Sequence, residues 1–404
     1  MYVENLENWV VNYDENEIPP YTIPDVLLCN DGTKVTTKEE WLTKRRGELL
    51  KQFKDLMYGE LPPLPDKVEY TEVYPRKPTL NNLAYKQETK ITFKMNNNKS
   101  CSATLLLYTP INVEKAPVFV GLTFVGLHAS SLDPEISITG NLLPNFSPER
   151  GTRKENYPVE EIVKRGYAVA LLSCNEIFPD HIDGWKDSIF KLFYSDEELQ
   201  KRLPNTSCIS AWAWGISRMM DYLETLPYID ADKACVYGHS RLGKTALWCG
   251  VNDQRFKLVC VNNSGCGGAA LSRRLFGETL FTMCTKSTFG KYWFTDSLLP
   301  KAVNHETLPI DQHELIALVA PRCVSVHSAT EDLWADPKSE YLSTYYAGCV
   351  WELFGKTPLK SIEQPAPTTP VGTDVSYYFR VGRHALVLED WNHYMDIADY
   401  IFKK

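Results

Sequence analysis

Short, strongly apolar segments separated by helical patterns dominate the chain from residue 116 onward. The apolar segments lie at 117–124, 167–173, 234–238, 258–263, 323–329 and 376–381. The apolar spacing of helices appears between them, at 159–166, 208–226, 243–250, 311–318 and 340–355. Strands that are apolar on both faces and joined by helical crossovers predict a mostly parallel sheet covered by helices on both sides.

The N-terminal part of the chain has a different pattern. Residues 1–36 read as an extended, proline-bearing lead-in. Residues 37–58 predict a helix capped by Thr37, with Glu40 three residues later and an apolar stripe of Leu42, Leu49, Leu50, Phe53 and Leu56. Alternating segments at 68–75, 85–95 and 101–110 predict an antiparallel edge of the sheet. The sequence shows no linker or internal repeat, so we expect a single domain over residues 1–404.

The composition is that of an ordinary globular protein, with 44% hydrophobic and 23% charged residues. A net charge of −8 favours neither nucleic acid nor an anionic lipid surface as a partner, and we expect a monomer that binds no membrane. Aromatic residues make up 12% of the chain, which suits the stacking of sugar rings as well as a large core.

The N-terminus has no basic, apolar or small-residue region of the kind that makes a signal peptide. We expect a cytoplasmic protein if Met1 is the native start, and a secreted one if a signal peptide has been removed. The eleven cysteines are scattered without a Cys-x-x-Cys pair, which favours a reducing compartment.

The segment CVYGHSRLGKTALWCG at 235–250 carries the candidate nucleophile, Ser240. A short apolar strand, a turn of small residues around the serine and an immediate helix hold a hydroxyl above the edge of a sheet. The N-terminus of that helix offers partial positive charge to an oxyanion. The chain begins with an antiparallel edge, continues with alternating strands and helices, and carries a serine elbow on a central strand. This order predicts the α/β-hydrolase fold.

His384 is the candidate base, because it follows the strand at 376–381 and precedes a C-terminal helix. Four other histidines follow Ser240 and fit this position less well: His305, His313, His327 and His393. The acid is expected after the strand at 323–329. Asp336 is a natural helix cap there, which leaves Asp332, our choice, and Glu331.

These residues resemble carbohydrate esterase family 15, the glucuronoyl esterases, above all its bacterial branch. The resemblance covers nearly the whole chain, including GHSRLGKTALWCGVNDQRFKLVCVNNSGCGGAALSRR, SATEDLWADPKSEYL and GRHALVLEDWNHYMDIADY. It implies a serine esterase, without metal or cofactor, that cleaves the ester between glucuronic acid of xylan and a lignin alcohol.

Roles follow from the resemblance residue by residue. Ser240 matches the nucleophile, His384 the base, and Arg241 the arginine that helps to form the oxyanion hole. Asp332 matches the acid after the seventh strand. The resemblance also implies sugar-binding residues, namely Lys244, Glu278 and Trp334.

The chain departs from the family pattern at two places. Asn263 stands where fungal members carry a glutamate, and an amide cannot stabilise an imidazolium by charge, so the acid must come from the 331–332 site. Gly126-Leu127-His128 replaces a Gly-Asn-His sequence, so the second oxyanion donor stays open. Alternative functions are an acetyl ester or acetylxylan esterase and a non-catalytic carbohydrate-binding relative.

Overall fold

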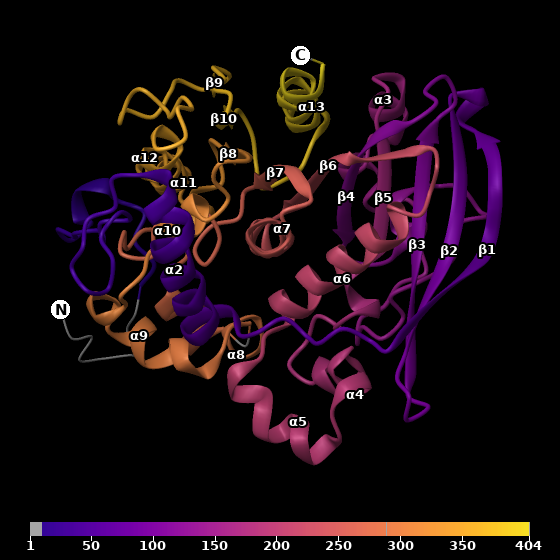
Figure 1. Ribbon diagram of the computed structural model, residues 1–404, viewed down its shortest axis with the longest axis horizontal. Helices are drawn as coiled ribbons and strands as arrows, with labels where there is room; N and C mark the ends of the chain where they lie inside the picture. Colours follow the sequence, from indigo (N-terminus) through magenta and orange to yellow (C-terminus); the bar gives the residue numbers. More distant parts are fainter. Residues whose placement is uncertain (1–9, 288, 404) are drawn as a thin grey trace.

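The computed structural model describes residues 10–287 and 289–403 and builds them around one ten-stranded sheet (Figure 1). The spatial order of the strands is β1-β2-β3-β5-β4-β6-β7-β8-β10-β9. Their bounds are β1 Lys67–Thr79, β2 Ala84–Lys94, β3 Ser100–Pro110, β4 Ala116–Thr123, β5 Ala168–Ser173, β6 Ile229–His239, β7 Phe256–Asn262, β8 Cys323–Ala329, β9 Val371–Gly372 and β10 Val375–Arg380.

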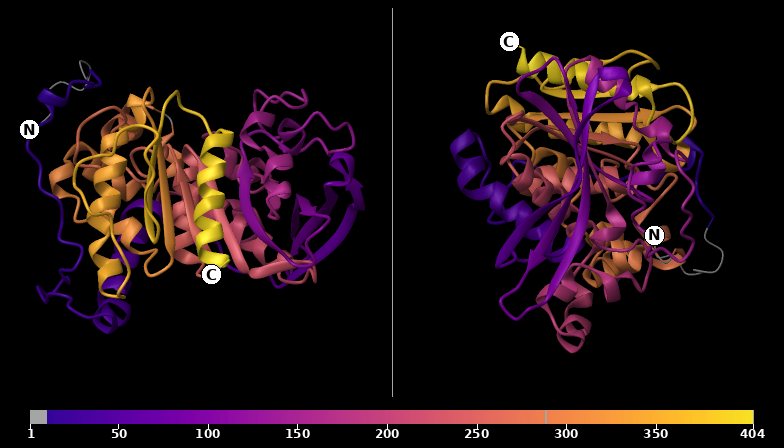
Figure 2. Two further views of the ribbon diagram at one scale, coloured as in Figure 1. Left: turned by 90° about the horizontal axis from the view of Figure 1, so that it is seen from above. Right: turned by 90° about the vertical axis from the view of Figure 1, so that its right-hand side faces the viewer.

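The sheet is parallel from β5 through β10 and antiparallel at its edges. β5, β4, β6, β7, β8 and β10 pair in parallel, whereas β1, β2 and β3 pair antiparallel and join the parallel part through β5. The antiparallel strands curve away from the rest of the sheet (Figure 2). This is the α/β-hydrolase fold, as the sequence predicts.

Helices cover both faces of the sheet. Helices α3 and α13 lie on one face, and α6, α7, α10 and α11 on the other (Figure 1). Their apolar side chains pack into the two hydrophobic clusters on either side of the sheet. The helix bounds are α1 Lys38–Glu40, α2 Arg46–Phe53, α3 Val159–Lys164, α4 Phe190–Phe193, α5 Asp196–Arg202, α6 Cys208–Leu223, α7 Arg241–Asn252, α8 Gly290–Trp293, α9 Leu299–Val303, α10 Gln312–Ala317, α11 Pro337–Ala347, α12 Cys349–Glu352 and α13 Leu388–Phe402.

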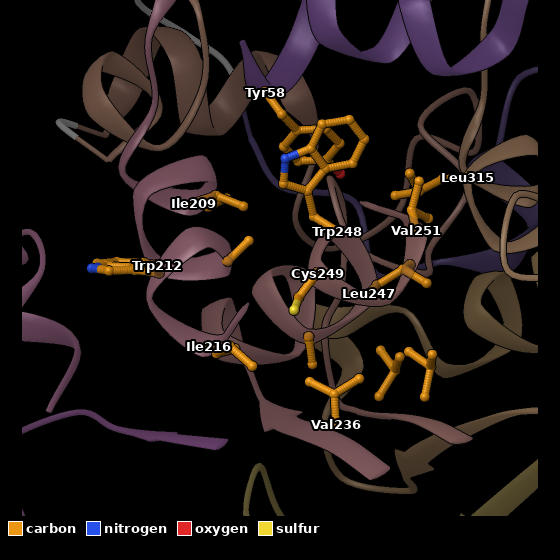
Figure 3. Packing of buried hydrophobic residues seen from close by; sticks show 14 of the residues in the cluster. Tyr58, Ile209, Trp212, Ile216, Val236, Leu247, Trp248, Cys249, Val251 and Leu315 are labelled. Atoms are coloured by element: carbon orange, nitrogen blue, oxygen red, sulfur yellow. The ribbon is translucent and has the colours of Figure 1, made fainter. Parts of the chain in front are cut away.

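The helix that follows Ser240, α7, is buried almost throughout its length. Trp248 stacks on Tyr58 with ring centroids 4.6 Å apart, and its indole N–H donates to Ser210 Oγ at 2.8 Å (Figure 3). On the sheet side, a Cβ at Gly250 would lie 2.4 Å from Val259, so only glycine allows this close approach to β7. Such packing holds the N-terminus of α7, and with it Ser240, in one position.

The predicted helix at 37–58 is confirmed as one continuous helical segment from Lys38 to Tyr58, with π-helical turns at Trp41–Arg45 and Lys54–Tyr58. Thr37 accepts from the Glu40 N–H in a capping box, as predicted. The predicted stripe is wrong at Leu42, which is 52% exposed. Trp41 is fully buried instead, because the first π-helical turn rotates the apolar face.

The eleven cysteines all fall within the described residues and form no disulfide. In the described part of the chain no helix combines the length and apolar character needed to cross a bilayer.

Candidate active site

Ser240 lies at a strained corner between β6 and α7. Its φ of 58° and ψ of −130° are unusual for a residue with a side chain, and its N–H donates to Asn262 O at 2.8 Å. A Cβ at Gly238 would lie 1.9 Å from Leu242 O, so the turn requires glycine at that position. The predicted strand–turn–helix context of the serine is therefore present.

The imidazole of His384 contacts a carboxylate from the neighbouring strand end. His384 Nδ1 lies 2.6 Å from Asp332 Oδ2, and the same oxygen accepts a hydrogen bond from Asn263 Nδ2 at 2.7 Å. Glu331 points elsewhere: its carboxylate lies 3.4 Å from the exposed guanidinium of Arg383. The geometry thus favours Asp332 over Glu331 as the partner of His384.

The charge state of Asp332 follows from these contacts. Burial by itself raises the pKa of Asp332, but the hydrogen bonds from His384 and Asn263 and the charges of His384 and His239 together hold the pKa below its ordinary value of 3.8. Asp332 is therefore a carboxylate at neutral pH, which can stabilise a protonated His384.

The other histidines after Ser240 lie away from the cavity that holds it. His327 is buried in β8, with Nδ1 3.1 Å from Asp390, and His393 packs on Tyr378 with ring centroids 3.6 Å apart. His313 Nε2 donates to Pro24 O at 2.9 Å, and His305 lies in a short 3-10 turn, residues 305–307. Of the eight histidines, all in the described residues, only His384 lines the cavity.

One cavity of about 520 Å³ brings together the candidate catalytic and sugar-binding residues except Glu331, the alternative acid. Its polar lining includes Ser240, Arg241, Lys244, Asn263, Glu278, Asp332 and His384. An apolar side is formed by Met283, Phe289, Trp293 and Trp334. The cavity thus combines a nucleophile and a base with charged groups and indole rings, as the binding of a polar ring requires.

Arg241, the residue after Ser240, is held by an acid that the sequence analysis did not identify. Its guanidinium forms an ion pair with Asp180 and lies 4.6 Å from the centre of the Phe124 ring. Asp180 also accepts hydrogen bonds from Tyr292 Oη at 3.1 Å and Trp293 Nε1 at 3.2 Å. A carboxylate in a long connecting segment has no local pattern, so only the tertiary contacts reveal that Asp180 orients both Arg241 and Trp293.

Lys244 and Glu278 form a buried pair on the floor of the cavity. Lys244 Nζ donates to Glu278 Oε2 at 3.0 Å, to Ser264 O at 2.6 Å and to Cys266 O at 2.7 Å. An ammonium has three N–H donors, so these contacts use all of them. In this structure Lys244 fixes the carboxylate of Glu278, which lines the cavity.

Trp334 and Glu278 are joined through their backbones. The Glu278 N–H donates to Trp334 O at 2.7 Å. Gly277 has a φ of 58°, and a Cβ there would lie 2.4 Å from Leu333 O, so glycine lets the two loops touch. The indole of Trp334 is 39% exposed, which leaves a face free for stacking.

The N-terminal segment, predicted as a plain lead-in, contacts these loops. Asn12 O accepts from the Gly277 N–H at 2.9 Å, and Glu15 forms an ion pair with Arg274, which also pairs with Asp336. Tyr13 lies edge-on against Phe276, and burial followed by the charge of Asp332 raises the pKa of its phenol. Residues 12–15 therefore brace the segment that carries Glu278.

The candidate backbone donors for an oxyanion differ in whether they already have an acceptor within the protein. The N–H of Leu127 donates to Thr139 Oγ1 at 2.9 Å, so it does not serve an oxyanion in this structure. The imidazole of His128 faces Ser147 O at 3.0 Å. Arg241 is the first residue of α7, where a backbone N–H has no acceptor within the helix.

Replacing Asp332 tests its charge state through stability. A carboxyl group whose pKa is lowered on folding stabilises the protein above its ordinary pKa, and this contribution is lost as the pH falls through the folded pKa. We expect Asp332→Asn to lower the free energy of unfolding at neutral pH, by an amount that shrinks as the pH falls below 3.8. Urea unfolding of both proteins across this range measures the difference; a constant difference would contradict the assignment of charge.

Comparison with known proteins identifies the family of this site. A family model described as "Glucuronyl esterase, fungi" matches residues 162–355. Carbohydrate esterase MZ0003, from an unknown prokaryotic organism, is 38% identical over 96% of this chain and 91% of its own length. A 4-O-methyl-glucuronoyl methylesterase of Schizophyllum commune is 29% identical over 85% of this chain and 76% of that protein.

Solved structures agree with these sequence matches. A glucuronoyl esterase from Solibacter usitatus superposes with a TM-score of 0.89 at 36% identity, covering 96% of this chain and 100% of that one. A promiscuous CE15 esterase from a marine bacterial metagenome gives a TM-score of 0.88 at 38% identity, covering 97% of this chain and 100% of that one. The chain belongs to carbohydrate esterase family 15, the glucuronoyl esterases.

Proposed function

We propose that this protein is a serine esterase that hydrolyses glucuronoyl esters, with 4-O-methyl-glucuronate of xylan esterified to lignin alcohols as the natural substrate class. The observation that carries the proposal is the hydrogen bond of 2.6 Å between His384 and Asp332, at the edge of a cavity that also holds Ser240. The name of the Schizophyllum commune relative supports the substrate class.

In this mechanism His384 takes the proton of Ser240 as the hydroxyl attacks the ester carbonyl. Asp332 stabilises the imidazolium that forms. The Arg241 guanidinium and its backbone N–H, with the N-terminus of α7, stabilise the oxyanion of the tetrahedral intermediate. His384 then donates its proton to the leaving alcohol. In the second half of the reaction His384 takes a proton from water as the water attacks the acyl-enzyme, and then returns that proton to Ser240 as the acid is released.

We assign recognition of the uronic acid to two other residues that line the cavity, Glu278 and Trp334. Glu278 accepts hydrogen bonds from the sugar hydroxyls, and Trp334 stacks on the pyranose ring. Lys244 contributes by holding Glu278 in place, because its N–H donors are all bound within the protein. A uronoyl ester carries its carbonyl on the sugar itself, so a bound ring places that carbonyl beside Ser240.

A second candidate is hydrolysis of acetyl esters, including those of xylan. It is favoured by the description of the marine metagenome relative as promiscuous and by a triad chemistry that cleaves any accessible ester. A non-catalytic carbohydrate-binding protein is the least favoured alternative, since nucleophile, base and acid are all present. Covalent labelling of Ser240 by a fluorophosphonate would exclude a purely binding role.

Kinetics on two substrate types test the proposed function. We expect benzyl glucuronate to be hydrolysed with a higher kcat/KM than p-nitrophenyl acetate. Glu278→Gln and Trp334→Ala should raise KM for the glucuronate at least about tenfold while changing aryl acetate hydrolysis little, because only the uronate offers hydroxyls and a ring to bind. Trp334→Phe is the matched control, since it keeps an aromatic face. Equal losses on both substrates would contradict sugar recognition.

A further inference from the structure

The segment 381–387, which carries His384, joins β10 to α13 and has no regular secondary structure. The side chain of His384 is 41% exposed, and its ring contacts are with Asp332 and the ring of His239, whose centroid lies 4.4 Å away. Two side-chain contacts on an irregular loop do not by themselves hold an imidazole in line with a hydroxyl, so the loop backbone must be fixed by other groups.

The guanidinium of Arg380, the last residue of β10, lies inside this loop and is 3% exposed. Its Nη2 donates to Arg383 O and, at 2.6 Å, to Ala385 O. These are the carbonyls on either side of His384. The loop wraps closely around the guanidinium: Gly382 has a φ of 123°, and a Cβ there would lie 2.9 Å from Arg380 Nη1.

Asp390, a fully buried residue in the first turn of α13, fixes the other side of Arg380. Its Oδ2 accepts from Arg380 Nε at 3.0 Å and from the Val387 N–H at 3.0 Å, and its Oδ1 lies 3.1 Å from His327 Nδ1. The guanidinium therefore cannot rotate away from the loop without breaking a buried ion pair, and all three of its nitrogens donate hydrogen bonds.

The same loop is tied to the strand end that supplies the acid. Gly382 O accepts from the Glu331 N–H at 2.8 Å, and the Gly382 N–H donates to Thr330 Oγ1 at 3.1 Å. The two loops carrying His384 and Asp332 are thus joined directly, and Arg380 sets where the rest of the His384 loop lies relative to that junction.

We infer that Arg380 is a positioning residue for catalysis, which holds the backbone on both sides of His384 so that the imidazole keeps its contact with Asp332 in the cavity that also holds Ser240. The inference rests on the proposed function in that His384 acts as the base. It assigns a role to a buried ion pair that neither touches the substrate nor lines the cavity.

The test compares Arg380→Gln, Arg380→Lys and the double variant Arg380→Gln/Asp390→Asn with the parent protein. Arg380→Gln should lower kcat on the order of 10²-fold for both glucuronate and aryl acetate esters, with KM little changed, because a misplacement of about 1 Å costs this much without affecting sugar binding. The kcat of Arg380→Lys should lie between those of the parent and Arg380→Gln, since lysine keeps the positive charge but lacks the several N–H donors of the guanidinium.

Stability is separated from positioning by the double variant and by a matched control. Arg380→Gln leaves Asp390 buried without its cation and should lower Tm, whereas Arg380→Gln/Asp390→Asn removes both charges and should recover much of Tm but not kcat. Arg322 is the control: it also donates to three backbone carbonyls, at Gly250, Asp253 and Phe256, before the start of β8. Arg322→Gln should lower Tm while leaving kcat near that of the parent.

Recovery of kcat together with Tm in the double variant, or a kcat for Arg380→Gln within about threefold of the parent, would overturn the inference. The rate of fluorophosphonate labelling of Ser240 gives a readout that needs no choice of ester, because labelling requires the same base. If the parent is labelled and Arg380→Gln is labelled equally fast, the inference about Arg380 is overturned but the proposed function is not. If glucuronate esters are not hydrolysed but labelling slows in Arg380→Gln, only the proposed substrate fails. A parent that is not labelled overturns both.

Discussion

Replacing Ser240 by alanine should abolish ester hydrolysis while leaving the fold intact, with kcat reduced at least about 10⁴-fold. The hydroxyl is the group that forms the covalent intermediate, and no other residue of the described cavity stands at the corner between β6 and α7. Alanine keeps the Cβ that the strained backbone already accommodates, so Tm should change little.

Ser287 provides a matched control for this change, because it lines the same cavity but lies outside the elbow. Ser287→Ala should keep nearly full activity, and a fluorophosphonate should label the parent and Ser287→Ala but not Ser240→Ala. Activity of Ser240→Ala within tenfold of the parent would reject Ser240 as the nucleophile.

Asp332→Asn should lower kcat on the order of 10²- to 10⁴-fold. The amide keeps the size of the side chain, and it can still bond His384, but it supplies no negative charge to the imidazolium. It can also hold His384 in the wrong tautomer. Asn263, a neighbour within hydrogen-bond distance, donates to Asp332 and cannot replace its charge.

Glu331→Gln is the matched control for Asp332→Asn, since it removes the adjacent carboxylate without touching His384. It should cost far less in kcat, as should Asn263→Ala. Kinetics on one glucuronate ester measures all three variants. A larger loss for Glu331→Gln than for Asp332→Asn would show that the acid is the neighbouring residue, and no loss for either would contradict the triad.

Features with a local pattern could be predicted from the sequence. The elbow at Ser240 is a strand, a turn and a helix in consecutive residues, and Asp332 and His384 each follow a strand at the same edge of the sheet. Parallel strands bring such ends together, so the order of elements is enough to predict that these residues meet. The cap of the helix at Thr37 is likewise a local signal.

Features that depend on distant contacts could not be predicted in this way. Asp180 pairs with Arg241 across the fold, and Arg380 acts through carbonyls whose positions depend on how the loop closes. Glu340, fully buried, accepts hydrogen bonds from Ser264 and Ser328, and burial raises its pKa to about 7. The prediction that Leu42 belongs to the apolar stripe was wrong because a π-helical turn changes the helical period on which it rested.

Residues 12–15 contact the loop that carries Glu278. Through this contact, docking of the N-terminal segment and binding of the sugar would be thermodynamically coupled. Asn12 bonds Gly277, directly beside the residue assigned to the sugar hydroxyls. If docking increases the affinity for the uronic acid by some factor, the bound uronic acid must favour the docked segment by the same factor, because coupling free energies are reciprocal. The affinity of the site for the uronic acid and the docking of a stretch of chain remote in sequence from the triad would then change together.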